Sequence, residues 1–365
     1  MVRALTIHPR FSRRAFIRAG LGGGAALLAA SYPLFFERRW LQVNTYRIPV
    51  PHLPHALTGL RIAQVTDLHY GLLVSLQWLQ HVIESTNSLD ADVIVCTGDY
   101  VHHRGAVEPV DAIWPLLLRL RARLGVFSVL GNHDHWAHTQ RSLEWLERSG
   151  QSVRHRARPV EKDGARLWIA GAGDYWEDLS GLDEALDAVP EDECRIALAH
   201  NPDSADEPRR QRVDLMISGH THGGQVRLPF LGAPILPVKN KAYSSGLIVT
   251  DHSRVFISRG IGWAIAPVRL NCRPRSRFSC SSQRRPPSAC RGARLCALVG
   301  CSNAHRARDL PWPAVVVAIH ESPLHGRRAR RTISTTGYGG LVQQHVSAKS
   351  TATRRAHAPQ PRPRQ

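Results

Sequence analysis

The chain has 365 residues, 43% of them apolar, and a formal net charge of +19, which together allow a large buried core and exclude a mostly disordered chain. Residues 272–365 carry 17 arginines and one lysine against two acids, a net charge of +16, whereas the first 271 residues carry 30 basic and 27 acidic residues. The positive charge therefore belongs to the C-terminal segment, and nucleic acid is not the expected partner of the folded part.

The N-terminus has the features of an export segment. Arg13 and Arg14 form a twin-arginine pair, and an uncharged stretch rich in Gly and Ala follows over residues 19–36. This is the pattern of a bacterial Tat signal, and the stretch is also just long enough to span a bilayer. We predict a Tat-type signal or membrane anchor over residues 1–39, a linker over 40–58, and a location in the periplasm or on the outer face of the cytoplasmic membrane. The alternative is a basic amphipathic helix with no export role.

From residue 60 onward, short β-rich runs alternate with helical patterns. The predicted strands are 60–66, 92–97, 126–130, 167–170, 195–199, 213–217, 246–250 and 254–258, the last two forming a hairpin. The predicted helices are 75–89, 107–123, 140–149, 182–189 and 205–211. This alternation predicts an α/β class with helices outside a mostly buried sheet, and so many short strands also suit two stacked sheets.

Polar side chains concentrate where the predicted strands end. They are Asp67, His69, Asp99, Asn132, His133, Asp134, His200, His220 and His222. The carboxyl ends of strands in α/β sheets converge on one crevice, so we expect these side chains at a single site. This set offers more ligands than one metal ion needs.

The residue types and their spacing favour two divalent metal ions. Asp67 and His69 are two residues apart, so in an extended segment both point to the same side and can hold one ion. Asp99 can bridge two ions with its two carboxylate oxygens. His222 would complete the first ion, and the second would be completed by Asn132, His200 and His220. Oxygen and nitrogen ligands without thiolate suit Mn, Fe or Zn, and two such ions can hold a bridging hydroxide for attack on a phosphate ester.

The segment SGHTHGGQV carries two of these histidines between glycines. We expect Gly219, Gly223 and Gly224 to allow tight turns with positive φ. Such turns would direct His220 and His222 to different ions.

The same residues carry a family resemblance. The blocks DLH at 67, GD at 98, GNHD at 131, H at 200 and GHTH at 219 resemble, in order and spacing, the signature of the calcineurin-like metallophosphoesterases over residues 58–272. The resemblance implies a four-layer α/β/β/α sandwich over residues 59–272 with a dinuclear metal centre. It also implies that His133 is the general acid that protonates the leaving alkoxide, and we expect Asp134 to orient its imidazole.

Within that superfamily, the N-terminal segment and the stretches GNHDHW, AHNPD and GHTHGGQVRLP look most like a membrane-associated subgroup. It includes Tat-exported bacterial phosphoesterases and relatives that cleave UDP-2,3-diacylglucosamine in lipid A synthesis. The implied substrate is a phosphoester or a pyrophosphate, lipid-linked or soluble, although an outward-facing enzyme would not meet cytoplasmic UDP-sugars. The alternative is a non-catalytic metal-containing protein with a basic tail that binds nucleic acid or lipid.

Other side chains near these blocks have less specific expectations. Four histidines are expected at the surface or behind the ligands, namely His102, His103, His135 and His138. Four tryptophans are expected in the core or a pocket wall, namely Trp136, Trp168, Trp176 and Trp263. Arg227 and Lys239 would either meet substrate phosphate or lie on a solvated loop.

Residues 273–365 depart from the family pattern. They are rich in Arg, Pro and Ser, have no helical or strand period, and are predicted to be a disordered, low-complexity tail. Their cysteines form no C-x-x-C pair. Our hypothesis is a shifted reading frame of a GC-rich gene that replaces a closing strand, and the alternative is a basic arm for nucleic acid or anionic lipid. Reading the other two frames around codon 274 tests it, and finding no homologous strand there would refute it.

Overall fold

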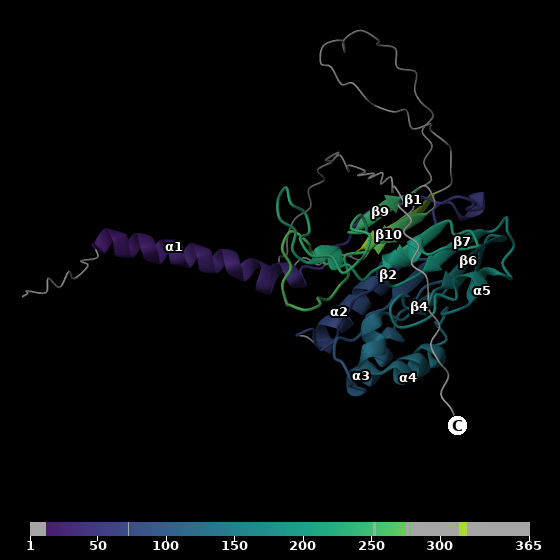
Figure 1. Cartoon of the computed structure of the whole chain (residues 1–365), viewed down its shortest axis with the longest axis horizontal. Coiled ribbons are helices and arrows are strands. Elements are labelled where there is room, and N and C mark those ends of the chain that lie inside the picture. Colours follow the sequence, from purple (N-terminus) through teal and green to yellow (C-terminus); the bar gives the residue numbers. More distant parts are fainter. Residues whose placement is uncertain (1–11, 72, 251–252, 275–276, 279–313, 320–365) are drawn as a thin grey trace, which may run out of the picture.

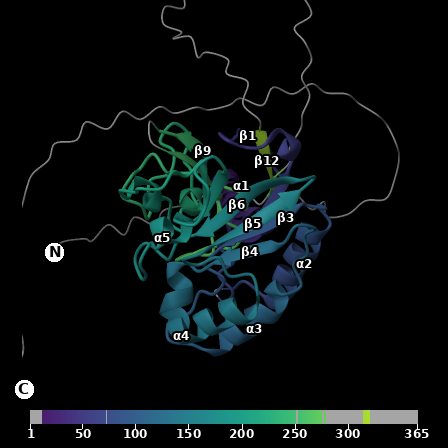
Figure 2. The same cartoon turned by 90° about the vertical axis from the view of Figure 1, so that its right-hand side faces the viewer.

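The computed structural model describes residues 12–71, 73–250, 253–274, 277–278 and 314–319. A long N-terminal helix projects from a body of stacked sheets and outer helices (Figures 1 and 2). The α-helices are α1 (Arg13–Ser31), α2 (Leu76–Asn87), α3 (Glu108–Leu117), α4 (Asn132–Arg148) and α5 (Leu182–Leu186). Short helical turns are η1 (Tyr32–Phe36), η2 (Glu37–Arg39), η3 (His55–Leu57), η4 (Pro202–Asp206) and η5 (His222–Gly224).

Two sheets lie at the centre of the body. The first has the order β1-β12-β2-β3-β4, with β11 paired to β12, and the second has the order β5-β6-β7-β8-β10-β9. The strands of the first sheet are β1 (Thr45–Pro49), β2 (Arg61–Val65), β3 (Val93–Thr97), β4 (Val126–Val129), β11 (Arg277–Phe278) and β12 (Ala314–Ile319). Those of the second are β5 (Ala157–Lys162), β6 (Ala165–Gly171), β7 (Cys194–Leu198), β8 (Leu215–Ser218), β9 (Gly246–Val249) and β10 (Arg254–Ile257). The strands β12, β2, β3 and β4 run parallel, as do β6, β7, β8 and β10.

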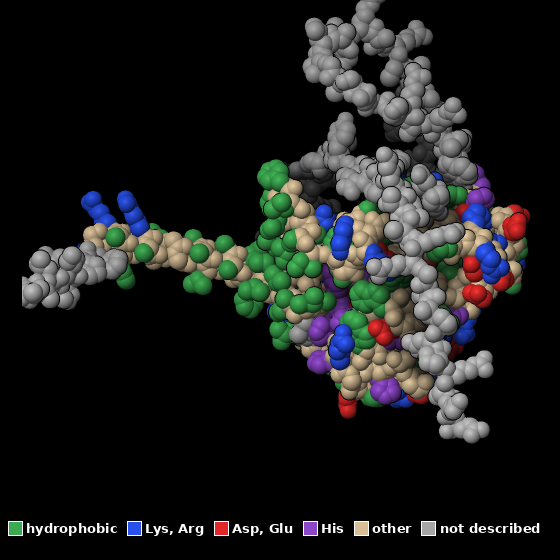
Figure 3. All heavy atoms as spheres, in the orientation of Figure 1, with side chains coloured by type: hydrophobic (Ala, Val, Ile, Leu, Met, Phe, Trp, Pro, Cys, Tyr) green, Lys and Arg blue, Asp and Glu red, His purple; other side chains and the backbone are tan. Residues whose placement is uncertain are grey.

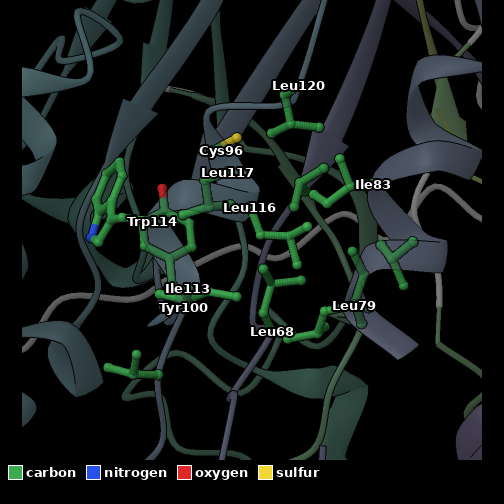
Figure 4. Packing of buried hydrophobic residues seen from close by; sticks show 14 of the residues in the cluster. Leu68, Leu79, Ile83, Cys96, Tyr100, Ile113, Trp114, Leu116, Leu117 and Leu120 are labelled. Carbon is green, nitrogen blue, oxygen red and sulfur yellow. The ribbon is translucent and has the colours of Figure 1, made fainter. Parts of the chain in front are cut away.

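Alternation along the strands builds the four layers. In β3, Val93 and Val95 face the second sheet, whereas Ile94 and Cys96 face the helices, because successive side chains of a strand point to opposite faces. Apolar residues of both sheets fill the layer between them. The helices α2, α3 and α4 cover the outer face of the first sheet through the cluster in Figure 4. On the outer face of the second sheet lie α5 and the loop around Tyr243. The predicted α/β/β/α sandwich is confirmed.

Two predicted helices differ from the structure near the site. The element α4 has a kink at His138, where φ is −170° and ψ is 98°, so the predicted helix over residues 140–149 corresponds to the part after the kink, and the turn before it, which begins at Asn132 and is capped by the Asp134 carboxylate through the Gly131 N–H, was not predicted. The predicted helix over residues 205–211 is wrong. The 3-10 turn η4 ends at Asp206, and Pro208 restricts the residue before it to extended backbone.

Two segments of the C-terminal region lie in the first sheet. The strand β12 pairs antiparallel with β1 and parallel with β2, and β11 pairs with β12. The prediction of a tail without regular structure is therefore wrong for these two segments. The remainder of residues 275–365, with cysteines 280, 290, 296 and 301, lies outside the described residues. Cys96, Cys194 and Cys272 are buried free thiols.

The N-terminal segment Arg13–Arg39 is long and apolar enough to cross a membrane, because an 18-residue window within it has a mean hydropathy of 1.4 and none of that window is buried in the protein. The side chain of Ser12 accepts a hydrogen bond from the Ala15 N–H and caps α1. This helix is compatible with a signal or an anchor.

Candidate metal centre

The carboxyl ends of four strands converge on one buried site. Six side chains from the loops after β2, β3, β7 and β8 form two clusters, and within each cluster the ligand atoms lie within 4.8 Å of one another. The first cluster contains Asp67, His69 and His222, and the second contains Asp99, His200 and His220. All six residues are buried, and the two histidines of the SGHTHGGQV segment fall in different clusters.

The Asp99 carboxylate lies between the two clusters. Its Oδ2 is 3.4 Å from His69 Nε2 and 3.2 Å from His200 Nε2. Within the first cluster, His69 Nε2 lies 2.9 Å from His222 Nε2, and within the second, His200 Nε2 lies 3.1 Å from His220 Nδ1. One oxygen of Asp99 therefore faces both clusters, instead of the two expected, because Oδ1 accepts a hydrogen bond from the His133 N–H at 2.9 Å.

The remaining polar contacts test whether these residues fit metal ions. His200 Nδ1 lies 2.7 Å from the Thr97 carbonyl, and His220 Nε2 lies 2.9 Å from the Pro237 carbonyl. A carbonyl accepts only from N–H, so the opposite nitrogen of each ring presents its lone pair to the site, as in metal-binding histidines. Asn132 Oδ1 is buried and has no hydrogen-bond partner among the described residues. A divalent cation would satisfy both the lone pairs and this oxygen.

Backbone strain is concentrated at this site. Residues other than glycine rarely adopt positive φ, and where they do the strain is often tied to function. Five residues of the two clusters do so, namely Asp67 (55°), His69 (48°), Asp99 (56°), His220 (68°) and His222 (50°). These conformations turn the chain sharply after each strand and direct the side chains inward.

The glycines of SGHTHGGQV serve two purposes. Gly223 and Gly224 have φ of 60° and 81°, as expected. Gly219 lacks positive φ, so the expectation is wrong there. A Cβ at Gly219 would lie 2.2 Å from Thr66 Oγ1 and 2.4 Å from Asp67 Oδ2, so glycine is required for close approach instead.

The buried charges favour a cation. Burial raises the pKa of Asp67 to about 6 against the opposing effect of His200. Burial also lowers the pKa of His69 and of His222 well below the ordinary value, which keeps both imidazoles neutral. The pKa of His200 is raised to about 10, because the carboxylate of Asp99 outweighs burial. His69 and His222 are therefore neutral, the form that binds a metal ion, whereas the raised pKa of His200 reflects the negative charge of the neighbouring carboxylates, which a cation at the site would also meet.

His133 lies beside the clusters at the start of α4. Its ring is edge-on to His69, with 4.6 Å between ring centroids, and 4.7 Å from the ring of Trp136. Its Nδ1 lies 3.2 Å from the carbonyl of His102, which orients the imidazole. The ring is only partly buried, so it can meet a substrate.

Asp134 does not orient that imidazole, so this expectation is wrong. Within the described residues its carboxylate accepts hydrogen bonds from the main-chain N–H groups of Asp99 and Tyr100, both at 2.8 Å, and of Gly131 at 2.9 Å. The reason is its place in the first turn of α4, where free N–H groups of neighbouring loops point at its side chain. Asp134 therefore shapes the loop that carries Asp99.

Two residues near the site were missed in the sequence. Asp174 follows β6, is buried, and has an Oδ2 atom without a hydrogen-bond partner in the described part of the chain. Burial raises its pKa to about 6, and its charge helps to raise that of His200. Arg269 is fully buried, and one terminal guanidinium nitrogen lies 3.2 Å from His222 Nδ1. Asp174 could have been predicted as a site residue, because it follows a predicted strand. The sequence around Arg269 has no feature that indicates a role at the site.

The aromatic and basic residues around the metal site lie in three kinds of place, namely beside the site, in the hydrophobic core and on the loops after η5. Trp136 and Trp176 stack at 6.0 Å between ring centroids, and the Trp176 ring is edge-on to that of His220. Trp263 is buried in the core. Arg227 donates to the Gly223 carbonyl and Lys239 to the Tyr175 hydroxyl.

The four histidines near the sequence blocks differ in how deeply they are buried. His102 is partly buried and belongs with His69 and His133 to a third group of possible ligands, whereas His135 is buried. His103 and His138 are exposed or partly exposed, as expected.

A four-layer sandwich with paired imidazole and carboxylate clusters at its strand ends defines a metal-dependent phosphoester hydrolase. Residues 60–224 match the family described as calcineurin-like phosphoesterase. An uncharacterised metallophosphoesterase of Bacillus subtilis, YkuE, is 30% identical over 273 residues, which cover 73% of this chain and 96% of the relative. The phosphodiesterase YaeI of Escherichia coli is 31% identical over 268 residues, covering 72% and 96%. A transmembrane protein with a metallophosphoesterase domain from Danio rerio is 32% identical over 254 residues, covering 64% and 55%. The chain belongs to the calcineurin-like phosphoesterase family.

Proposed function

We propose that the protein hydrolyses phosphodiester or pyrophosphate bonds at the membrane, within a domain over residues 59–272. The observation that supports it best is the position of Asp99, whose Oδ2 lies within 3.4 Å of a histidine from each cluster. Asp67, His69 and His222 would hold one divalent ion, and Asn132, His200 and His220 the other, with Asp99 shared between them. When bound, two such ions supply Lewis-acid polarisation of the phosphoryl group and a nucleophile from water.

His133 is the proposed proton donor to the leaving oxygen. Its Nδ1 is held by the His102 carbonyl, so its Nε2 is directed away from that contact and is free to carry the transferred proton. Trp136 and Trp176 form a stacked wall beside His133 and His220, where an apolar or planar part of the substrate would pack. The relative named as a phosphodiesterase favours a diester, and a UDP-2,3-diacylglucosamine-type pyrophosphate is the lipid-linked alternative within this proposal.

Hydrolysis of bis-p-nitrophenyl phosphate with added Mn²⁺ tests the proposal. Substitution of a residue that contacts metal ligands typically lowers activity by roughly 10–100-fold. We expect Asp99→Asn to lower the hydrolysis rate by more than this. Asp163→Asn changes an exposed aspartate at the opposite end of the sheet and should leave the rate unchanged. Equal rates for the two variants would contradict the proposal. A screen of phosphomonoesters, phosphodiesters and UDP-2,3-diacylglucosamine would then identify the bond that is cleaved.

The role of His133 has its own test. Removing a general acid costs about 100-fold or more, but only when the leaving group needs a proton. His133→Gln should therefore be impaired far more on an alkyl phosphodiester than on bis-p-nitrophenyl phosphate, whose leaving group is a stable anion. A uniform loss on both substrates would indicate a structural role instead.

The export route is proposed from the twin arginines before α1. Replacing Arg13 and Arg14 together by lysine should leave the protein in the cytoplasm, whereas replacing Arg38 and Arg39, which follow α1, should not. Cell fractionation with an antibody to the folded domain measures this, and unchanged export of the lysine pair would contradict a Tat signal.

A further inference from the structure

Large apolar side chains are exposed where α1 joins the body. Figure 3 shows hydrophobic side chains gathered at this junction, with histidine side chains next to them. Five exposed large apolar side chains lie on the two loops that follow His222 and Trp263 and are called the apolar rim, namely Leu228, Phe230, Leu231, Ile235 and Ile265. Leu231, Ile235 and Ile265 are 77%, 71% and 86% exposed, and Phe230 is fully exposed. Apolar side chains gathered on one face at this exposure mark an interaction surface.

Hydrogen bonds hold the two loops of the rim together. The Arg227 N–H donates to the Leu270 carbonyl at 2.9 Å, and the Leu270 N–H donates to the Gln225 carbonyl at 2.9 Å. The Gln225 side chain also bonds the backbone of Ala264 in both directions, at 2.7 and 2.8 Å. The tips of the two loops are therefore parts of one surface.

The segment that follows α1, made of η1 and η2, is attached to that same surface. The Arg269 N–H donates to the Pro33 carbonyl at 3.1 Å, and the Cys272 N–H donates to the Glu37 carboxylate at 2.7 Å. The guanidinium of Arg38 lies 4.7 Å from the Trp263 ring. The exposed large apolar side chains of this segment are Leu34, Phe35 and Phe36 in η1 and Trp40 after η2. The apolar segment that follows α1 and the apolar rim thus belong to one face.

The main turn of the rim is built to present apolar groups. Two hydrogen bonds between Leu228 and Gly232, at 2.8 and 2.9 Å, close it tightly. Phe230 at its tip has a φ of 66°, which costs energy in a residue with a side chain. In water, a strained and fully exposed phenylalanine at the tip of a closed turn does not contribute favourable free energy. Inserting the same side chain into an apolar phase is favourable, because it removes apolar surface from water.

We infer that this face docks onto the surface of a lipid bilayer. Where α1 crosses the membrane, its end must lie at the interface, and the hydrogen bonds above bring the rim to the same depth. Aromatic residues such as Trp40 and Phe230 suit the interface, and the exposed cations Arg39, Lys239 and Lys241 can meet lipid phosphates. A second copy of the chain is the less suitable occupant, because the N-terminal helix that projects from this face (Figure 1) is long and apolar enough to cross a membrane.

Docking would also set the position of the metal centre. The segment that carries the rim turn leaves the site directly after His222 and returns to it at Pro237, whose carbonyl bonds His220. The site is therefore connected to the apolar rim by a single loop. The inference concerns a surface and goes beyond the proposed function, so it holds or fails whatever bond is cleaved.

Photo-crosslinking of the full chain in vesicles of phosphatidylethanolamine and phosphatidylglycerol tests this inference. A benzophenone amino acid at position 230, or separately at 265, should form about tenfold more lipid adduct than one at position 163. Asp163 is an exposed residue in the β5–β6 turn, at the end of β6 opposite the metal site. Both rim positions are exposed, so the substitutions leave the core intact. Equal lipid adduct at all three positions, or crosslinks from 230 and 265 to a second copy, would overturn the inference.

Discussion

The guanidinium of Arg269 lies 3.2 Å from Nδ1 of His222, and both side chains are buried. The same guanidinium donates to the carbonyls of Arg259, Gly262 and Cys272 and so clamps the loop after β10. Burial chiefly lowers the pKa of His222, and the charges of His69 and Arg269 lower it further. Arg269 therefore fixes the position of the His222 ring and disfavours its charged form, and because a guanidinium can only donate, Nδ1 is the acceptor in this contact.

Arg269→Lys should weaken metal binding without removing the charge. Lysine lacks the planar fork that reaches several carbonyls, so His222 would lose its fixed orientation. We expect Mn²⁺ affinity to fall by about 10–100-fold, as measured by calorimetric titration. Arg227→Lys is the control, because Arg227 is partly exposed and bonds one carbonyl. Unchanged affinity in Arg269→Lys would contradict the positioning role.

His220 and His222 should each control a different ion. They lie in separate clusters, so removing one imidazole leaves the other cluster with all its ligands. We expect His220→Ala and His222→Ala each to bind one tightly held ion where the natural chain binds two, as counted by mass spectrometry of the metal content. His81→Ala, which changes an exposed histidine of α2, should retain both ions. Loss of both ions in either variant would show that the two sites do not form independently.

Asp134→Asn should destabilise the fold. The carboxylate of Asp134 uses both oxygens to accept main-chain hydrogen bonds, and an amide can offer only one acceptor there. Leaving a buried N–H unsatisfied costs about 1–3 kcal/mol in the free energy of unfolding. Urea denaturation measures this, with Asp163→Asn as a control that should change little. A loss of activity at unchanged stability would instead support a direct role in catalysis.

Gly219→Ala tests the close approach of β8 to Asp67. The added methyl would meet Thr66 and Asp67 at distances no real side chain tolerates, so one of them must move. We expect a loss of about 1–3 kcal/mol in stability, together with weaker metal binding. Gly22→Ala in α1 is the matched control, because a methyl there meets nothing within 4 Å. Crystals or thermal melts of Gly219→Ala that match the natural chain would rule out this packing argument.

The elements that carry the site are largely predictable from the sequence. Buried parallel strands are short continuous apolar runs, and β2, β3, β4, β7 and β8 were all recognised in this way. Four strands were missed, and two of them, β11 and β12, lie in the segment predicted to be a low-complexity tail. The residues of β1 read as a linker because its partner β12 lies near the other end of the chain, and β5 is an edge strand with a single buried residue, Val160. Such pairings leave little local signal, because they depend on contacts made only in the fold.

The sequence by itself determined which ligands are available, their order along the chain and the family to which the chain belongs, because metal chemistry depends on residue type and each ligand directly follows a strand. Only the tertiary structure decided which residues contact and orient these ligands and the proposed general acid. It assigns the orientation of His133 to the His102 carbonyl rather than to Asp134, and it brings Arg269 to His222. It also places the exposed apolar loops beside the end of α1. These relations depend on side-chain direction at strained backbone positions and on contacts between distant segments, and no local pattern records either.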